Sequence, residues 1–155
     1  MYLLAILGVI LSVLLMGLFS PDGMASLSSC LDLFALLLII VIVIPVMAAM
    51  GMLKDLNHAF RLTLGRKAAG ELRELKRAKT AMVYLIRCVV LAGVTGTLAG
   101  VMQVLSFGSE EMTTLTASLG VAICPLLYAF VIAIVLLPIE ARLEQKIVEF
   151  MENEE

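Results

Sequence analysis

The residues in this chain whose types could do chemistry are threonines and glycines set inside long apolar runs. Thr95 and Thr97 lie within the segment AGVTGTLAG at residues 92–100, and Thr116 lies near the start of a later apolar run. Threonine hydroxyls that border water inside a membrane protein can lie along an ion path, which is the functional interpretation of these positions. In the alternative interpretation, each hydroxyl donates to the carbonyl four residues earlier in its own helix, and the segment serves packing alone. The sequence leaves both interpretations open.

Small residues recur around these threonines at helical spacing. Ala92, Gly96 and Gly100 lie four residues apart, a pattern that lets two helix backbones approach closely within a membrane. Gly93 and Thr97 form an adjacent stripe, so small residues and a hydroxyl share one side of the helix. The candidates for helix packing are Ala92, Gly93, Gly96, Gly100, Gly120 and Pro138.

Groups that would support other chemistry are missing from the apolar runs. None of the runs contains Asp or Glu in its interior, although Asp32 lies at the outer end of one. Because conduction of protons or cations through a membrane usually requires an ionisable group, a partner would have to supply a carboxylate. The sequence has no nucleophile–base set, phosphate-binding loop or metal-ligand spacing, and we assign no role to the single His58. It therefore predicts neither an enzyme nor a cofactor or metal site.

Four apolar runs must form the elements that position these residues. The chain has 155 residues, 62% of them hydrophobic, with a mean hydropathy of +1.09, which is too apolar for a soluble domain. A helix needs about 20 apolar residues to cross a bilayer, and residues 2–19, 33–53, 88–105 and 115–139 are long enough. The prediction is an all-α integral membrane protein with four transmembrane helices. The first run lacks a basic leader region, so we expect a retained span rather than a cleaved signal peptide.

Lys and Arg predict the orientation of these spans. Residues 54–79 hold eight of the eleven basic residues, whereas residues 20–32 and 106–114 hold none. Because positively charged loops stay on the cytoplasmic side, the basic segment and both termini are predicted to be cytoplasmic. The predicted organisation is a first transmembrane pair at 1–53, a short basic cytoplasmic loop or helix at 54–80, a second, channel-like pair at 81–139, and an acidic amphipathic tail at 140–155.

The two cytoplasmic segments are predicted to be helical and carry opposite charge. Helix-forming residues from Arg66 to Thr80 continue into the third span without a break, which predicts one continuous rod. In the tail, apolar residues recur at the spacing of one helix face, at Ile139, Leu143, Ile147 and Phe150. Because the tail carries six Glu, we expect an electrostatic contact between the tail and the basic loop.

The basic loop has a possible binding role of its own. Arg73, Lys76 and Arg77 are candidates for contact with an acidic partner protein. In the alternative interpretation, the loop determines topology and lies near anionic lipid headgroups.

Four parts of the chain resemble MotA-type stator proteins of the MotA/TolQ/ExbB ion-channel family. They are SSCLDLFALLLI at 28–39, GVTGTLAG at 93–100, GVAI at 120–123 with LYA at 127–129, and LPIEARLE at 137–144. Four spans with both ends inside also resemble MotA rather than TolQ or ExbB, which have three. The resemblance implies a homo-oligomeric ring, a pentamer by analogy, around a single-span partner of the MotB, ExbD or TolR kind. It also implies a multi-pass protein of the bacterial cytoplasmic (inner) membrane.

The same resemblance implies roles for particular residues. Thr97 would face the pore and Asp32 would lie near the outer entrance, while ion flow past the partner's aspartate would turn the ring. Two departures qualify these roles. First, a short basic loop stands where such stators usually carry a larger, rotor-contacting domain. Second, Pro125 and Leu126 replace the threonine pair typical of sodium-using members, which favours the proton as the coupling ion.

The expected function is therefore that of the ring-forming subunit of an ion-driven membrane motor or channel complex. Its partners would be other copies of the chain, the single-span protein and the lipid bilayer, and not nucleic acid. Two rival functions are a non-conducting four-helix scaffold and, with the least support, a small-solute transporter. The transporter has no support from an internal repeat or a polar site at mid-membrane.

Overall fold

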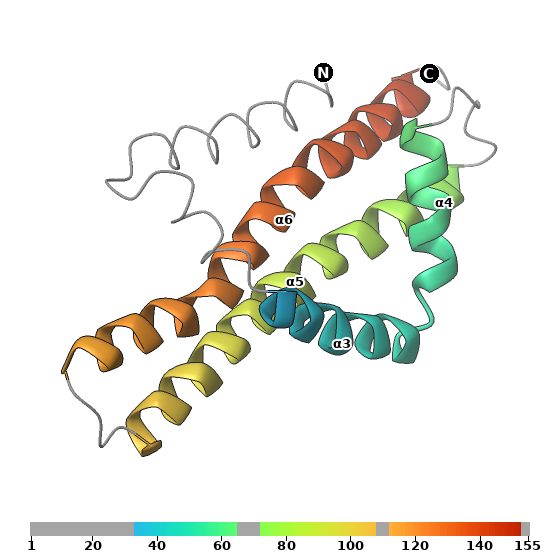
Figure 1. The fold of residues 1–155 in the computed structure, drawn as a ribbon. Helices are drawn as coiled ribbons and strands as arrows, with labels where there is room; N and C mark the ends of the chain where they lie inside the picture. Colours follow the sequence, from blue (N-terminus) through green and yellow to red (C-terminus); the bar gives the residue numbers. More distant parts are fainter. Residues whose placement is uncertain (1–32, 65–71, 108–111, 153–155) are drawn as a thin grey trace, which may run out of the picture.

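The described part of the chain is entirely helical. The structure is a computed structural model that describes residues 33–64, 72–107 and 112–152. Its elements are α3 (Leu33–Ala49), α4 (Leu53–Leu64), α5 (Leu72–Phe107) and α6 (Met112–Glu152) (Figure 1). The expected first span, the outer segment that follows it and Asp32 lie outside the described residues.

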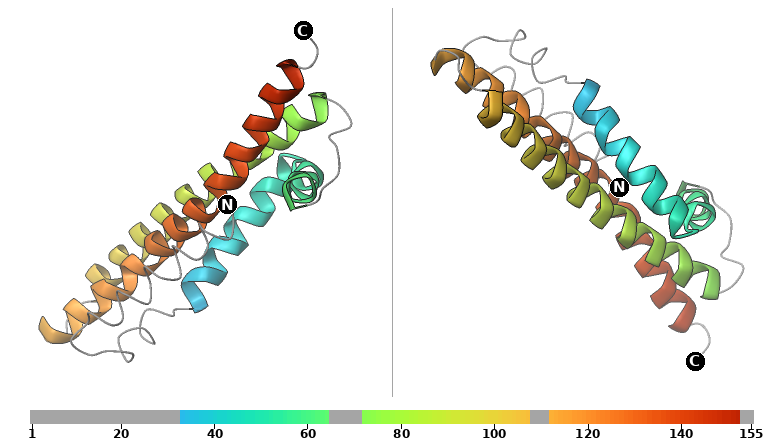
Figure 2. Two further views of the ribbon diagram at one scale, coloured as in Figure 1. Left: turned by 90° about the horizontal axis from the view of Figure 1, so that it is seen from above. Right: turned by 90° about the horizontal axis from the view of Figure 1, so that it is seen from below.

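The two longest helices, α5 and α6, lie side by side and antiparallel in all three views (Figures 1 and 2). They contain 36 and 41 residues, which at 1.5 Å per residue gives lengths of roughly 54 and 62 Å. A bilayer's hydrocarbon core is about 30 Å thick, so both helices must project beyond it. The prediction that the third span continues inward as one rod is confirmed from Leu72 onward, and its first part, residues 66–71, lies outside the described residues. The fourth span was expected to end around Pro138, whereas α6 continues as helix through Pro138 to Glu152.

A sharp corner joins α3 and α4. Gly51 adopts a φ of +69°, which a glycine reaches without steric cost. Its N–H donates to the carbonyl of Ala48 (2.9 Å), and the N–H of Met52 donates to the carbonyl of Met47 (3.2 Å). This pair of hydrogen bonds ends α3, and the axis turns by 106° into α4. The expected boundary at Leu53 was therefore wrong, because Leu53 begins the next helix.

Helix α4 is an element that the sequence interpretation did not separate from the basic loop. Ala59 and Leu62 are buried against the other helices, while Lys54 and Arg61 are exposed. The pattern Leu53, Leu56, Ala59 and Leu62, three residues apart, was the signal that could have revealed it.

The core is a single apolar cluster contributed by all four helices. Its most enclosed members include Met47 of α3, Met82 of α5, and Ile139 and Leu143 of α6. No polar residue is classed as buried among those the structure describes. The tail residues Ile139, Leu143 and Ile147 are buried, and Phe150 is half-buried, so the predicted apolar stripe of the tail is confirmed as a packing face.

Large apolar side chains also cover the outside of the molecule. They include Leu91, Leu98, Met102, Phe130 and Ile134, each at least half exposed. Such an extent of exposed apolar surface is incompatible with water and fits contact with lipid or with other membrane helices. Two of the described helices are long and apolar enough to cross a membrane, and three if the bent α3–α4 pair counts as one span.

Candidate functional site

The backbones of α5 and α6 approach closely along the glycine stripe. A Cβ placed on Gly93 would overlap the Cβ of Ala129, and one on Gly100 would lie 3.1 Å from the Cβ of Ala122. A Cβ on Gly96 would lie 3.0 Å from Pro125 and equally close to Leu38 of α3. These glycines therefore allow α5 to lie directly against the backbone of α6. The absence of a side chain at Gly96 also leaves room for Leu38 of α3.

The threonines of α5 differ in how their hydroxyls are satisfied. Thr95 is exposed, and its Oγ1 donates to the carbonyl of Leu91 at 2.8 Å. This is the hydrogen bond to the carbonyl four residues earlier that the packing interpretation predicts. The Oγ1 of Thr97 is inaccessible to solvent and has no hydrogen-bond partner among the described residues. Leaving a buried hydroxyl without a partner costs about 1–3 kcal/mol. Within the part of the chain that the structure describes, Thr97 therefore carries a buried polar group without a partner, which packing alone does not explain.

Thr97 lies on the α6 side of α5. It follows Gly93 by four residues and precedes Gly100 by three, and both of those glycines contact α6. The contacts of Gly96 with Pro125 and of Gly100 with Ala122 place Thr97 at the level of residues 122–125 of α6. Pro125 has no N–H and so cannot satisfy the carbonyl of Val121 in the usual helical manner. An unpartnered hydroxyl and a carbonyl without its helical donor therefore lie at the same depth of this interface.

A pocket of about 700 Å³ opens beside this interface, between α3, α5 and α6. Gly96, Gly100 and Pro125 line its floor, and Gln103 and Ser106 contribute its polar side chains. The remaining lining residues are Phe34, Ala35, Leu38, Ala99, Met102, Val121 and Ala122. Thr97 does not line the pocket, so the groove and the buried hydroxyl are separate features of the α5–α6 pair.

The other predicted ion-path and packing residues lie elsewhere. Thr116 is exposed and makes a polar interaction near the beginning of α6. Ala92 is buried, whereas Gly120 is exposed and nothing among the described residues lies within 4 Å of a Cβ built there. Pro138 is half-buried within α6. Their roles in an ion path or in assembly stay predictions.

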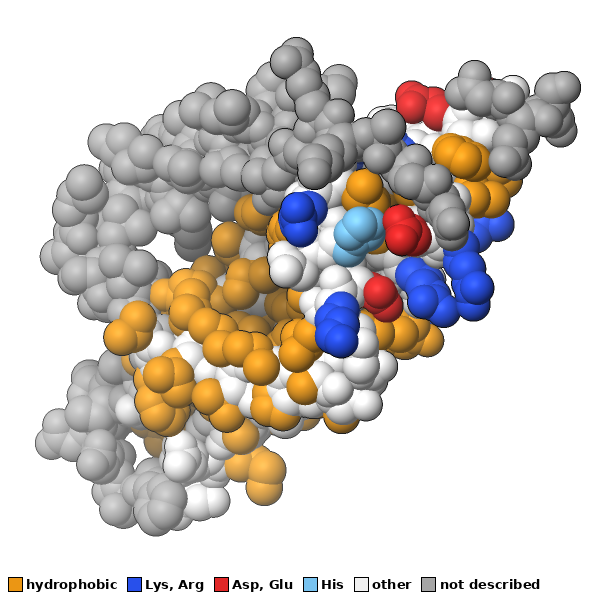
Figure 3. Space-filling model, turned by 90° about the vertical axis from the view of Figure 1, so that its right-hand side faces the viewer, with side chains coloured by type: hydrophobic (Ala, Val, Ile, Leu, Met, Phe, Trp, Pro, Cys, Tyr) orange, Lys and Arg blue, Asp and Glu red, His pale blue; other side chains and the backbone are white. Residues whose placement is uncertain are grey.

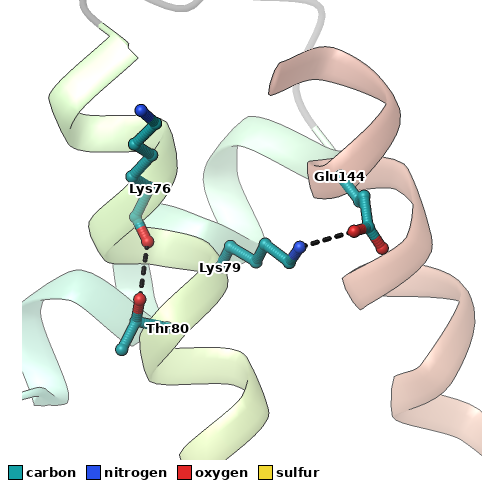
Figure 4. Close-up of polar contacts among 4 residues, drawn as sticks. All are labelled: Lys76, Lys79, Thr80 and Glu144. Carbon is teal, nitrogen blue, oxygen red and sulfur yellow. Dashed lines mark hydrogen bonds and ion pairs between the residues drawn. The ribbon is translucent and has the colours of Figure 1, made fainter. Parts of the chain in front are cut away.

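Polar contacts join the charged ends of α4, α5 and α6. Lys79 Nζ of α5 lies 2.6 Å from Glu144 Oε1 of α6 (Figure 4), and Lys146 Nζ donates to the carbonyl of Leu62 at 2.7 Å. The expected electrostatic contact between the basic loop and the acidic tail is confirmed by the Lys79–Glu144 pair, and the Lys146 contact adds a hydrogen bond from the tail to the backbone of α4. His58, which had no assigned role, lies 3.5 Å from Glu74 and so links α4 to α5.

The residues proposed for partner contact gather at the beginning of α5. Arg73, Lys76 and Arg77 are exposed, and they line a second pocket, of about 670 Å³, against the α3–α4 corner. Within the described ranges, no group of His, Cys, Asp and Glu could hold a metal ion.

Fold and surface together define an all-α membrane protein in which small residues join two long helices around an unpartnered hydroxyl. Residues 42–155, well over half of the chain, match the model of the MotA/TolQ/ExbB proton channel family, and the chain belongs to that family. A search of curated proteins and a search of solved structures each found no match.

Proposed function

We propose that the chain is the ring-forming subunit of a small ion-driven motor or channel complex in the bacterial inner membrane. The observation that carries the proposal is the buried, unpartnered hydroxyl of Thr97 in the close-packed α5–α6 interface of a proton-channel family member. A hydroxyl held in this way can hydrogen-bond to a water or to an ionisable group of a neighbouring chain. The role is one of conduction and coupling, not of enzymatic catalysis.

The absence of carboxylates from the apolar parts of α3, α5 and α6 implies a second component. The described acidic residues are Asp55, Glu74, Glu140, Glu144, Glu149 and Glu152, and all of them lie in α4 or toward the cytoplasmic ends of α5 and α6. The ionisable group of a proton path would therefore come from a single-span partner whose membrane segment carries an aspartate. Five copies of the chain would surround such a partner, as in the related stators.

The coupling ion is proposed to be the proton. Pro125 stands in the fourth span where a sodium-using member would present a threonine hydroxyl, and it packs against Gly96 instead. Fewer oxygen ligands disfavour the coordination of a dehydrated Na⁺, whereas a proton needs only a chain of hydrogen-bonded groups. Between the spans lies the short α4 rather than a large cytoplasmic domain. Contact with a flagellar rotor through such a domain is therefore an unsupported part of the analogy.

The proposal is tested by ion flux. The complex, purified gently from its own cells, would be placed in vesicles that contain a pH-sensitive dye, and a proton gradient or a sodium gradient would be imposed. We expect dye acidification that depends on the proton gradient and is unchanged by sodium. An assembled complex that passes neither ion would contradict the proposal and favour the non-conducting scaffold.

A further inference from the structure

The pocket at the α3–α4 corner joins a basic surface to an apolar one. Arg73, Lys76 and Arg77 line it from α5, and Met50 and Met52 line it from the corner. Gly51, Asp55, Leu72 and Thr80 complete the lining. Figure 3 faces this end of the molecule, where Lys and Arg side chains gather beside a continuous apolar area.

The three basic side chains of this pocket have no ionic partner among the described residues, so they suit the binding of an anion. None of them makes an ion pair or side-chain hydrogen bond with another described residue, in contrast to Lys79, which pairs with Glu144. Arg73 lies three residues before Lys76 and four before Arg77, so all three lie near one face of α5. Like charges at this spacing repel, and an anion in the pocket would relieve that repulsion. Among the described residues that line the pocket, Asp55 is the only carboxylate.

Residue types that favour the membrane–water interface lie next to the pocket. Tyr84 and Arg87 stack with 6.0 Å between the guanidinium carbon and the ring centroid, one to two turns beyond Thr80 on α5. Both are exposed, and an exposed Tyr–Arg pair is typical of the membrane–water interface. Above the corner, Val46, Met50 and Leu53 are exposed and apolar. A molecule in the pocket would therefore meet cations at one end and a lipid-facing surface at the other.

We propose that this pocket binds one anionic phospholipid of the cytoplasmic leaflet. The guanidinium groups of Arg73 and Arg77 take its phosphate through paired hydrogen bonds, with Lys76 adding charge. Its acyl chains lie along the exposed side of α3 at Val46 and past Met50 of the corner. The bound lipid joins the α3–α4 corner to the first turns of α5. This inference stands independently of whether the complex conducts ions.

The test compares lipid binding by two full-length variants with equal loss of charge. The double variant Arg73→Gln/Arg77→Gln removes the phosphate ligands, and Arg61→Gln/Arg142→Gln is the control because both residues are exposed outside the pocket. Binding of phosphatidylglycerol to the detergent-purified protein would be titrated by native mass spectrometry. At about 1 kcal/mol for each basic residue near the membrane surface, the pocket variant should bind roughly 30-fold more weakly, and the control within about twofold of the parent chain.

Two further arms identify the ligand. Phosphatidylcholine with the same acyl chains should bind at least tenfold more weakly than phosphatidylglycerol, and millimolar inorganic phosphate should not displace the lipid. Asp55→Asn should tighten phosphatidylglycerol binding, because it removes the repelling carboxylate. Equal losses in both double variants, equal binding of the two lipids, or displacement by free phosphate would overturn the proposal. So would a pocket variant that binds lipid normally but loses an acidic protein that co-purifies with the parent chain.

Discussion

At the residue scale, the hydroxyl of Thr97 is the feature that favours a functional interpretation of the glycine–threonine segment over a purely structural one. Thr95 and Thr97 are two residues apart in the same helix, yet only Thr95 donates to its own helix. Sequence could not distinguish them, because the choice depends on the χ1 rotamer that packing against α6 permits. The role of the glycines in close helix approach, by contrast, could be inferred from their spacing alone.

The first prediction concerns Thr97→Val, a nearly isosteric change that deletes the unpartnered hydroxyl. A hydrogen bond from such a hydroxyl to a charged group contributes about 1.5–3 kcal/mol, so proton flux should fall at least about tenfold. Assembly should be unchanged, because no intramolecular hydrogen bond is lost among the described residues. Flux is measured in vesicles as above.

Thr95→Val is the matched control for that experiment. It removes a hydroxyl that already has a partner, the carbonyl of Leu91, and should leave flux within about twofold of the parent chain. If Thr97→Val conducts as well as the parent, Thr97 does not lie on the ion path.

The second prediction concerns the close approach at Gly93. Gly93→Ala puts a methyl group where the Cβ of Ala129 lies, and forcing the helices apart should destabilise the protein by about 1–3 kcal/mol. Gly120→Ala adds the same methyl into open space and should be neutral or slightly stabilising. Thermal unfolding in detergent provides the comparison. Equal melting temperatures for the two variants would show that the close contact at Gly93 does not contribute to stability.

At the element scale, the sequence predicted the long helices well and the corner poorly. The rod of α5 and the tail face of α6 follow from unbroken helix formers and from apolar residues that repeat at helical spacing. The end of α3 did not follow, because Gly51 sits within an apolar run, AAMGML, that reads as the continuation of a span. Only the positive φ and the hydrogen bonds of Gly51 and Met52 show that the chain turns there. The first expected span and Asp32 lie outside the described residues and stay predictions.

The third prediction tests the corner. Gly51→Ala should destabilise the fold by about 1–2 kcal/mol, since a Cβ is unfavourable at this φ although no neighbour lies within 4 Å of it. Gly51→Asn should be milder, because Asn tolerates the left-handed conformation better than Ala. Hydrogen exchange of the α4 amides should rise in the Ala variant more than in the Asn variant. Unchanged exchange in both would mean that the corner is held by the packing of α4 rather than by its turn.

At the scale of the whole molecule, the described chain has an incompletely covered apolar exterior. Helices of roughly 54 and 62 Å exceed the bilayer core, and their charged ends are tied together by Lys79 and Glu144 outside the apolar zone. Exposed side chains such as Leu91 and Phe130 run along the remaining length. Lipid can cover these side chains around a single copy, but the proposed conducting path needs further chains, because the apolar parts of the described helices carry no carboxylate. Assembly is therefore the central claim of the proposed function.

The most direct measurement of that claim is native mass spectrometry of the complex, extracted gently from its own cells. We predict a ring of five copies that retains a single-span protein with an aspartate in its membrane segment. A monomer or dimer that carries no such companion, under conditions where the fold is intact, would contradict the motor assignment.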